Sequence, residues 1–212
     1  MTSCELCETR RARRACPGIR GQICAVCCGT EREVSVSCPL ECEYLQEARR
    51  HERTPDPDPE KLPSPDIAVS EAFLERNQRL VSFVADALAE AALRAPGVVD
   101  SDVREALDSL VRTYRTLESG LYYESLPTNP LAGLVHQNVR RKVEEVRRDI
   151  RQQAGVTPFR DADVLGSLVF FQRLGYYYDN RRRRGRAFID FLRMHSAQTS
   201  PSPEAASRLI VP

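Results

Sequence analysis

The residues of this chain best able to do chemistry are its cysteines, and all eight lie within the first 42 of 212 residues. Thiolates act as nucleophiles, redox groups and ligands for soft metal ions. Two C-x2-C pairs stand roughly 20 residues apart, the pattern typical of structural zinc sites, because one tight turn offers two sulfurs to the same ion. The eight are Cys4, Cys7, Cys16, Cys24, Cys27, Cys28, Cys38 and Cys42.

Eight cysteines fill two four-sulfur sites without remainder, so the sequence predicts two Zn²⁺ ions in closed, structural sites. We favour an interleaved pairing, because adjacent Cys27 and Cys28 point in opposite directions in an extended segment and so serve different ions. In the alternative, Cys28 is a free thiol and His51 completes the second site. The favoured pairing places Cys4, Cys7, Cys24 and Cys27 on one ion and Cys16, Cys28, Cys38 and Cys42 on the other.

The spacing from Cys4 to Cys27, followed by a distal ligand pair, resembles the B-box type of cross-brace zinc finger. The resemblance implies an interleaved fold that serves protein–protein interaction and self-association. The chain departs from that family in its distal pair, since Cys38 and Cys42 stand where the family normally has histidines. Ile19 lies near a family ligand position and cannot bind metal, and the gap before Cys38 is long. A treble-clef-like knuckle fits the same cysteines, and the central histidine of RING domains is missing.

Composition points to the cytoplasm. No run of about 18 apolar residues is present, so we expect no membrane span. The N-terminus, MTSCELCETRR, lacks the apolar core of a secretion signal. In a reducing compartment, clustered cysteines are metal ligands more often than disulfides. The net charge of +1 selects no class of partner.

The sequence divides into four parts. Residues 1–53 form the zinc-binding module, with strands expected at 22–26 and 34–36, a helix after Cys38, and positive φ at Gly18, Gly21 and Gly29. Residues 54–65, TPDPDPEKLPSP, contain five prolines and predict an extended linker. Residues 66–197 predict a bundle of about five helices, and 198–212 a disordered tail. The predicted fold is therefore a small zinc-stabilised module, cross-brace or treble-clef-like, followed by an all-α helical bundle.

The helices are predicted from apolar residues recurring with helical period. A capping box at Asp102 and Glu105 starts the second helix, and Gly120 ends it. Asn129 as N-cap and Pro130 at the first helical position start the third. The fourth is apolar on nearly all sides, which places it at the centre of the bundle. The five segments are 70–95, 102–120, 130–155, 161–175 and 182–195.

Two arginine-rich segments suggest anion or nucleic-acid contact, because arginines beside tyrosines suit phosphates and stacked bases. However, eight thiolates and two Zn²⁺ leave residues 1–53 with a net charge of −3, which favours solvated arginines in the first segment. Solvated arginines are also favoured in the second segment, because charge runs at helix ends are common and screened. Tyr122, Tyr123 and Glu124, between two helices, are expected to cap the core. The candidate contact residues are Arg10, Arg11, Arg13, Arg14, Tyr178, Arg181, Arg182, Arg183, Arg184 and Arg186.

No catalytic motif is recognisable. Phosphate loops, G-x-S-x-G and H-E-x-x-H are missing, and neither His136 nor His195 has an acidic or cysteine neighbour in register. We therefore predict a non-enzymatic zinc-binding interaction or adaptor protein. Its helical domain binds a protein partner or a second copy, with no small-molecule substrate and no membrane contact. The alternative is a nucleic-acid-binding regulator that uses the two arginine-rich segments.

Overall fold

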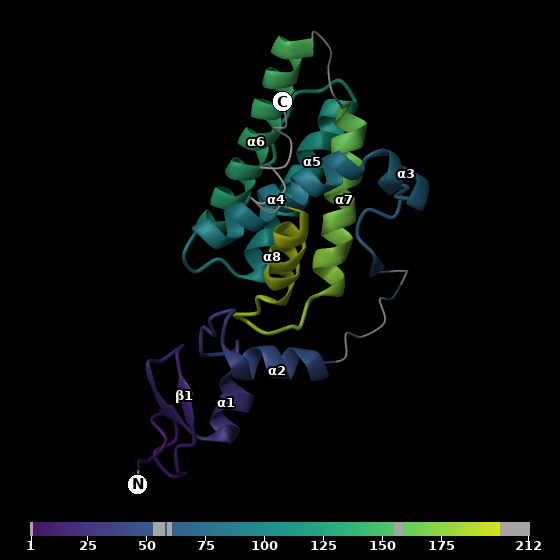
Figure 1. Cartoon of the computed structure of the whole chain (residues 1–212). Helices are drawn as coiled ribbons and strands as arrows, with labels where there is room; N and C mark the ends of the chain where they lie inside the picture. Colours follow the sequence, from purple (N-terminus) through teal and green to yellow (C-terminus); the bar gives the residue numbers. More distant parts are fainter. Residues whose placement is uncertain (1, 53–57, 59–60, 155–158, 200–212) are drawn as a thin grey trace, which may run out of the picture.

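The computed structural model describes residues 2–52, 58, 61–154 and 159–199 (Figure 1). It is mostly helical, with the cysteines gathered at the N-terminal end. The predicted linker lies partly outside the described residues, and the predicted tail lies almost entirely outside them. Among the described helices, none combines the length and the apolar character needed to cross a bilayer.

The N-terminal module begins with a hairpin. Strands β1 (Arg14–Cys16) and β2 (Gly21–Ile23) pair antiparallel, with Cys16 opposite Gly21. Helix α1 (Ala25–Glu31) follows at once because the sulfur of Cys24 accepts the backbone N–H of Cys27 at 3.4 Å and caps the helix. The strand predicted at 22–26 therefore ends at Ile23. The strand predicted at 34–36 is also wrong, because only a single bridge joins Val36 to Arg32.

The helix predicted after Cys38 is confirmed as α2 (Glu43–His51). The glycine prediction is wrong: the left-handed residues of the module are Glu8, Arg20 and Glu33, with φ of 54°, 56° and 55°. Gly18 is needed for a different reason, since a Cβ there would lie 2.6 Å from Val36 Cγ1. Close approach of two chain segments, and not φ, excludes a side chain at that position.

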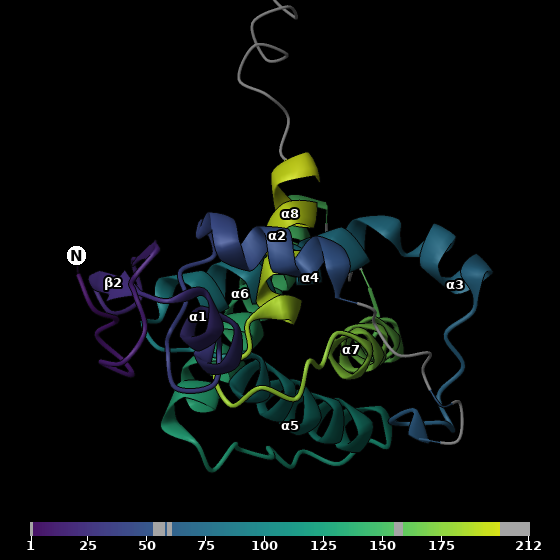
Figure 2. The same cartoon turned by 90° about the horizontal axis from the view of Figure 1, so that it is seen from below.

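Within residues 61–154 and 159–199, the body has six helices: α3 (Glu71–Arg76), α4 (Gln78–Arg94), α5 (Asp100–Glu118), α6 (Pro130–Ala154), α7 (Asp161–Tyr177) and α8 (Ala187–Thr199). The predicted first helix is divided at Asn77, whose side-chain amide donates to the Phe73 carbonyl at 3.1 Å. Helices α4 to α8 share one apolar core. Figure 2 shows α7 passing between α5 and α4, and its Val164, Leu165, Leu168 and Val169 are buried as predicted.

Several predicted helix ends are confirmed, and two are displaced. Asn129 Oδ1 accepts the Leu131 N–H at 2.8 Å at the start of α6, and Gly120 has a φ of 75° after α5. Helix α5 begins earlier than predicted because Asp102 is its third residue and accepts the Val99 N–H at 2.9 Å. Helix α8 begins later than residue 182.

The buried carboxylate of Asp100 fixes the start of α8. It accepts the N–H groups of Phe188 and Ile189, each at 3.0 Å. An acidic side chain at a helix N-terminus satisfies otherwise unpaired donors and complements the helix dipole. Residues 182–186 are thereby left as a loop, and this loop meets the N-terminal module.

The module packs directly on the helical body. Leu40 is buried in the same apolar core as the side chains of α4 to α8. Helix α2 lies across the lower end of the body, next to the start of α8 (Figure 1). The arrangement places the loop before α8 between the cysteines and the helices.

Candidate metal centre

Four cysteine sulfurs gather at the tip of the module. The ligand atoms of Cys4, Cys7, Cys24 and Cys27 all lie within 4.8 Å of one another. We call this group the first cysteine cluster. Tetrahedral zinc with bonds of about 2.3 Å separates its sulfurs by about 3.8 Å, so the cluster is compatible with one ion. All four members were predicted to share an ion, and the structure brings them together.

Two local turns position the first cluster. The segment from Cys4 folds back so that the Glu8 N–H donates to the Cys4 carbonyl at 2.7 Å, and the left-handed φ of Glu8 closes the turn. Cys24 and Cys27 occupy the cap and first turn of α1. Each C-x2-C pair therefore presents both sulfurs from one tight turn.

The electrostatics of the cluster fit a cation. Hydrogen bonds from the hydroxyl and backbone of Thr9 lower the pKa of Cys7 to about 5. Burial, followed by hydrogen bonds with the sulfurs of Cys24, Cys7 and Cys4, raises the pKa of Cys27 to about 12. Four adjacent thiolates repel one another, and a divalent ion at their centre relieves that repulsion. Thiolate donors suit Zn²⁺, so the four residues fit this ion.

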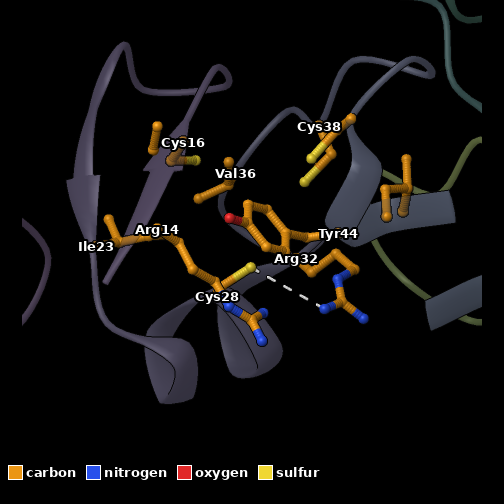
Figure 3. Close-up of a pocket in the computed structure, with 11 residues that line it drawn as sticks. Arg14, Cys16, Ile23, Cys28, Arg32, Val36, Cys38 and Tyr44 are labelled. Atoms are coloured by element: carbon orange, nitrogen blue, oxygen red, sulfur yellow. Dashed lines mark hydrogen bonds between the residues drawn. The ribbon is translucent and has the colours of Figure 1, made fainter. Parts of the chain in front are cut away.

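The remaining four cysteines surround a second location. Cys16, Cys28, Cys38 and Cys42, here the second cysteine set, line one small cavity with a volume of ≈ 10 Å³. That volume accepts about one water-sized sphere. Figure 3 shows Cys16, Cys28 and Cys38 around this cavity, with Val36 and Tyr44. Within the described residues, only the first cluster has all four sulfurs within 4.8 Å of one another.

Adjacent Cys27 and Cys28 serve different locations, as predicted, but for another reason. Both lie in α1, where successive side chains are turned by about 100°, and not in an extended segment. Cys27 therefore faces the first cluster while Cys28 faces the cavity. There the Cys28 sulfur lies 4.0 Å from Arg32 Nη2, and the Arg14 guanidinium lies 4.6 Å from the centre of the Tyr44 ring.

His51 does not take part in either group. Its Nε2 lies 3.0 Å from Glu47 Oε1 on the same helix, and its side chain is 76% exposed. The second-set cavity is lined by all four remaining cysteines and not by His51. The alternative in which His51 replaces Cys28 therefore has no geometric support.

The first arginine segment is divided between the two cysteine groups, with Arg10 beside the first cluster and Arg14 at the cavity of the second cysteine set. Arg10 hydrogen-bonds the Cys7 sulfur, which raises the pKa of this arginine. Arg14 stacks on Tyr44, whereas Arg11 and Arg13 are exposed. Two of the four arginines thus contact groups of the module itself, as outer neighbours of the cysteines.

The second arginine segment largely joins the module to the body. Arg182 pairs with Glu52 at 2.9 Å, Arg184 donates to the Ser37 hydroxyl at 2.5 Å, and Arg186 is half-buried, with its N–H donating to Glu33 at 2.9 Å. Tyr178 stacks on Phe191 with ring centres 4.4 Å apart. Only Arg181, Arg183 and Arg184 of this segment are exposed.

Sequence reasoning missed Glu33, the fully buried acid between the module and the body. Its carboxylate accepts from Arg49 at 2.7 Å, from Asn180 Nδ2 at 2.9 Å and from the Arg186 N–H at 2.9 Å. Burial raises the pKa of Cys38, and a hydrogen bond from the Glu33 backbone opposes that rise. Glu33 therefore contacts the second cysteine set and the helical body at once.

No family model, no curated protein and no solved structure matches this chain. The first cysteine cluster is compatible with a zinc finger in general, and no family match supports the B-box type in particular.

Proposed function

We propose that this chain is a non-enzymatic interaction or adaptor protein built on two structural zinc sites. The observation that carries the proposal is the interleaving of the cysteines. Cys4, Cys7, Cys24 and Cys27 converge within 4.8 Å, while the four intervening and following cysteines line one cavity of ≈ 10 Å³. Adjacent residues of α1 are thus directed to two separate locations.

The first cluster would hold one Zn²⁺ and the second cysteine set another. Zinc supplies cross-linking of segments that have too little apolar surface to fold by themselves. The apolar core of the module consists mainly of the cysteines with Ile23 and Val36. Such a small core needs metal for stability. Sites with four thiolate ligands leave no open position for a substrate, which is the reason for a non-enzymatic role.

The adaptor role rests on rigidity. The ion pairs Arg49–Asp190 and Glu52–Arg182 and the shared residue Leu40 hold the module against the helices, so surfaces of both parts are presented in one fixed arrangement. Preorganised surfaces lose less conformational entropy on binding. We place the protein in the cytoplasm, where thiols remain available to metal.

The nucleic-acid alternative depends on the arginines that remain exposed, chiefly Arg11, Arg13, Arg181 and Arg183. Phosphate binding needs several convergent cations and weakens steeply with salt. Titration of labelled single-stranded and duplex DNA at two salt concentrations separates the two functions. Tight binding that falls with salt and is lost in Arg11→Ala/Arg13→Ala would favour the alternative.

The decisive experiment is native mass spectrometry of protein purified without added zinc. We expect two Zn²⁺ per chain. One Zn²⁺ would leave the second cysteine set without a metal role and would overturn the two-site proposal. A folded module with reduced thiols and no metal would overturn the zinc proposal altogether.

A further inference from the structure

The connection between α5 and α6, residues 119–129, displays an unusual apolar surface. Leu121, Tyr122, Tyr123 and Leu126 are 65%, 77%, 67% and 62% exposed. Sequence analysis expected Tyr122 and Tyr123 to cap the core, and this expectation is wrong. Large apolar groups concentrated in one exposed segment mark an interaction site more often than isolated ones do.

The backbone of this connection is fixed along α5. Thr116 donates to the Tyr123 carbonyl at 2.8 Å, and the hydroxyl of Thr113 accepts the Ser125 N–H at 3.0 Å. Farther along, Glu105 accepts the N–H of Thr128 at 2.7 Å. Figure 2 shows the connection running back beside α5 at the lower edge of the molecule. The apolar side chains are therefore held in the solvent by an anchored backbone.

The anchoring leaves one backbone edge open. Between Tyr122 and Leu126, the backbone groups bound by α5 belong to Tyr123 and Ser125. In an extended chain, alternate residues direct their N–H and C=O groups to opposite sides, so those of Tyr122 and Glu124 point away from α5. Tyr122 and Glu124 also both reach Arg140 on α6, as residues two apart on one face of an extended chain do.

We propose that this open edge pairs with the same edge of a second copy, forming a two-stranded antiparallel ribbon across a two-fold axis. The ribbon centres on Tyr123, so the two Tyr123 side chains meet at the axis and Tyr122 of each copy lies opposite Glu124 of the other. The proposal deepens the interaction role proposed above and rests on it. An unpaired edge with apolar side chains is the feature used in strand addition.

Charge favours a second copy as the occupant. The single charged residue between Leu121 and Leu126 is Glu124, and it pairs with Arg140 of its own chain. The segment therefore carries no free charge that would select a strongly acidic or basic partner. The register centred on Tyr123 also keeps the two Glu124 side chains from facing each other. A two-fold contact of this kind is self-complementary.

The test is sedimentation equilibrium of the zinc-loaded full chain over the micromolar range, with Tyr123→Asp as the variant. Two aspartates opposite each other at the axis repel, so we expect wild-type dimers and a dissociation constant at least about 30-fold higher for the variant. Leu93→Asp is the matched control, because Leu93 is an exposed apolar residue on α4. It should leave the dimer intact.

Hydrogen exchange supplies a second measurement. The amides of Tyr122 and Glu124 should become protected as the concentration rises, and they should not in Tyr123→Asp. A wild-type monomer at all concentrations, or a dimer that Tyr123→Asp leaves unchanged, would overturn the proposal. Native mass spectra report zinc and copy number together. A monomer with two zinc ions would overturn the dimer proposal and leave the zinc proposal standing. A dimer without metal would overturn the zinc proposal and leave the dimer proposal standing.

Discussion

Arg49 of α2 joins Glu33 of the module to Asp190 of α8. Its Nη2 lies 2.7 Å from Glu33 Oε1, its Nη1 contacts Asp190 Oδ2, and the Glu33 side chain is fully buried. A guanidinium can serve two carboxylates because its donors form a planar fork. This single side chain connects parts of the chain separated by 141 residues.

Replacement of Arg49 by alanine should lower the free energy of unfolding by about 3 kcal/mol, because the buried carboxylate of Glu33 loses its nearest cation, whereas Asp190 keeps Arg193. The matched control is Arg50→Ala. Arg50 pairs with Glu47 at 3.1 Å on the exposed side of α2, and its loss should cost less than about 0.5 kcal/mol. Urea unfolding of the zinc-loaded proteins measures both. Equal losses in the two variants would contradict the role of Arg49.

Single cysteine variants should each remove one metal ion. Cys24→Ser breaks the first cluster and Cys38→Ser breaks the second cysteine set, so each protein should retain one Zn²⁺ per chain in native mass spectra. His51→Ala should retain two, because His51 lies exposed against Glu47. Loss of a metal ion in His51→Ala would restore the alternative ligand set.

His136 should make stability depend on pH. Its side chain is fully buried on α6, neither ring nitrogen has a hydrogen-bond partner among the residues that the structure describes, and burial lowers its pKa below 6.5. The unfolded chain then binds the proton more readily, so the stabilisation is complete above the unfolded pKa and falls as pH drops through it. His136→Leu should abolish this dependence and add about 1–3 kcal/mol at neutral pH.

The comparison of wild type with His136→Leu isolates this one group. Burial raises the pKa of Asp100 to about 7, which acts in the opposite sense, since stability then falls as pH rises toward that value. Asp100 is present in both proteins, and its contribution cancels in the difference. Urea unfolding between pH 5 and pH 8 provides the measurement. Parallel pH profiles would contradict the assignment to His136.

Alanine substitutions at two glycines should change the stability of the protein in opposite directions. A Cβ on Gly166 of α7 would lie 2.5 Å from the Phe73 ring of α3, so Gly166→Ala should destabilise by about 1–3 kcal/mol. In the described part of the chain, no neighbouring atom lies within 4 Å of the Cβ position of Gly133 on α6, and alanine there should stabilise by up to about 1 kcal/mol. Thermal unfolding of both variants measures the difference in sign.

The sequence predicted the helical periodicity and the gathering of Cys4, Cys7, Cys24 and Cys27, because both depend on local spacing. The Asn129 cap was predictable for the same reason. The capping box at Asp102 was misplaced because the true N-terminus of α5 lies at Asp100, and Glu105 instead binds Thr128. The sequence does contain a capping box, but Asp102 and not Glu105 completes it, because Glu105 contacts Thr128.

Long-range contacts explain the other failures. Nothing near Glu33 in the sequence indicates that Arg49, Asn180 and Arg186 converge on it. The arginines before α8 were interpreted by preference as solvated side chains and alternatively as an anion site, whereas Arg182, Arg184 and Arg186 contact groups of the module. Tyr123 suggested a core residue by its type, and the hydrogen bonds of α5 to the backbone keep it outside.

The position of Glu33 also has a consequence for synthesis on the ribosome. One of its partners, Asn180, lies 147 residues later in the chain. At roughly 5–20 residues per second, this delay is about 7–30 s. During that interval the proposed zinc sites can fill, but Glu33 lacks Asn180 and Arg186, and Leu40 has no helices to pack on. The nascent module is therefore exposed to chaperones and to early partners until the last helices emerge.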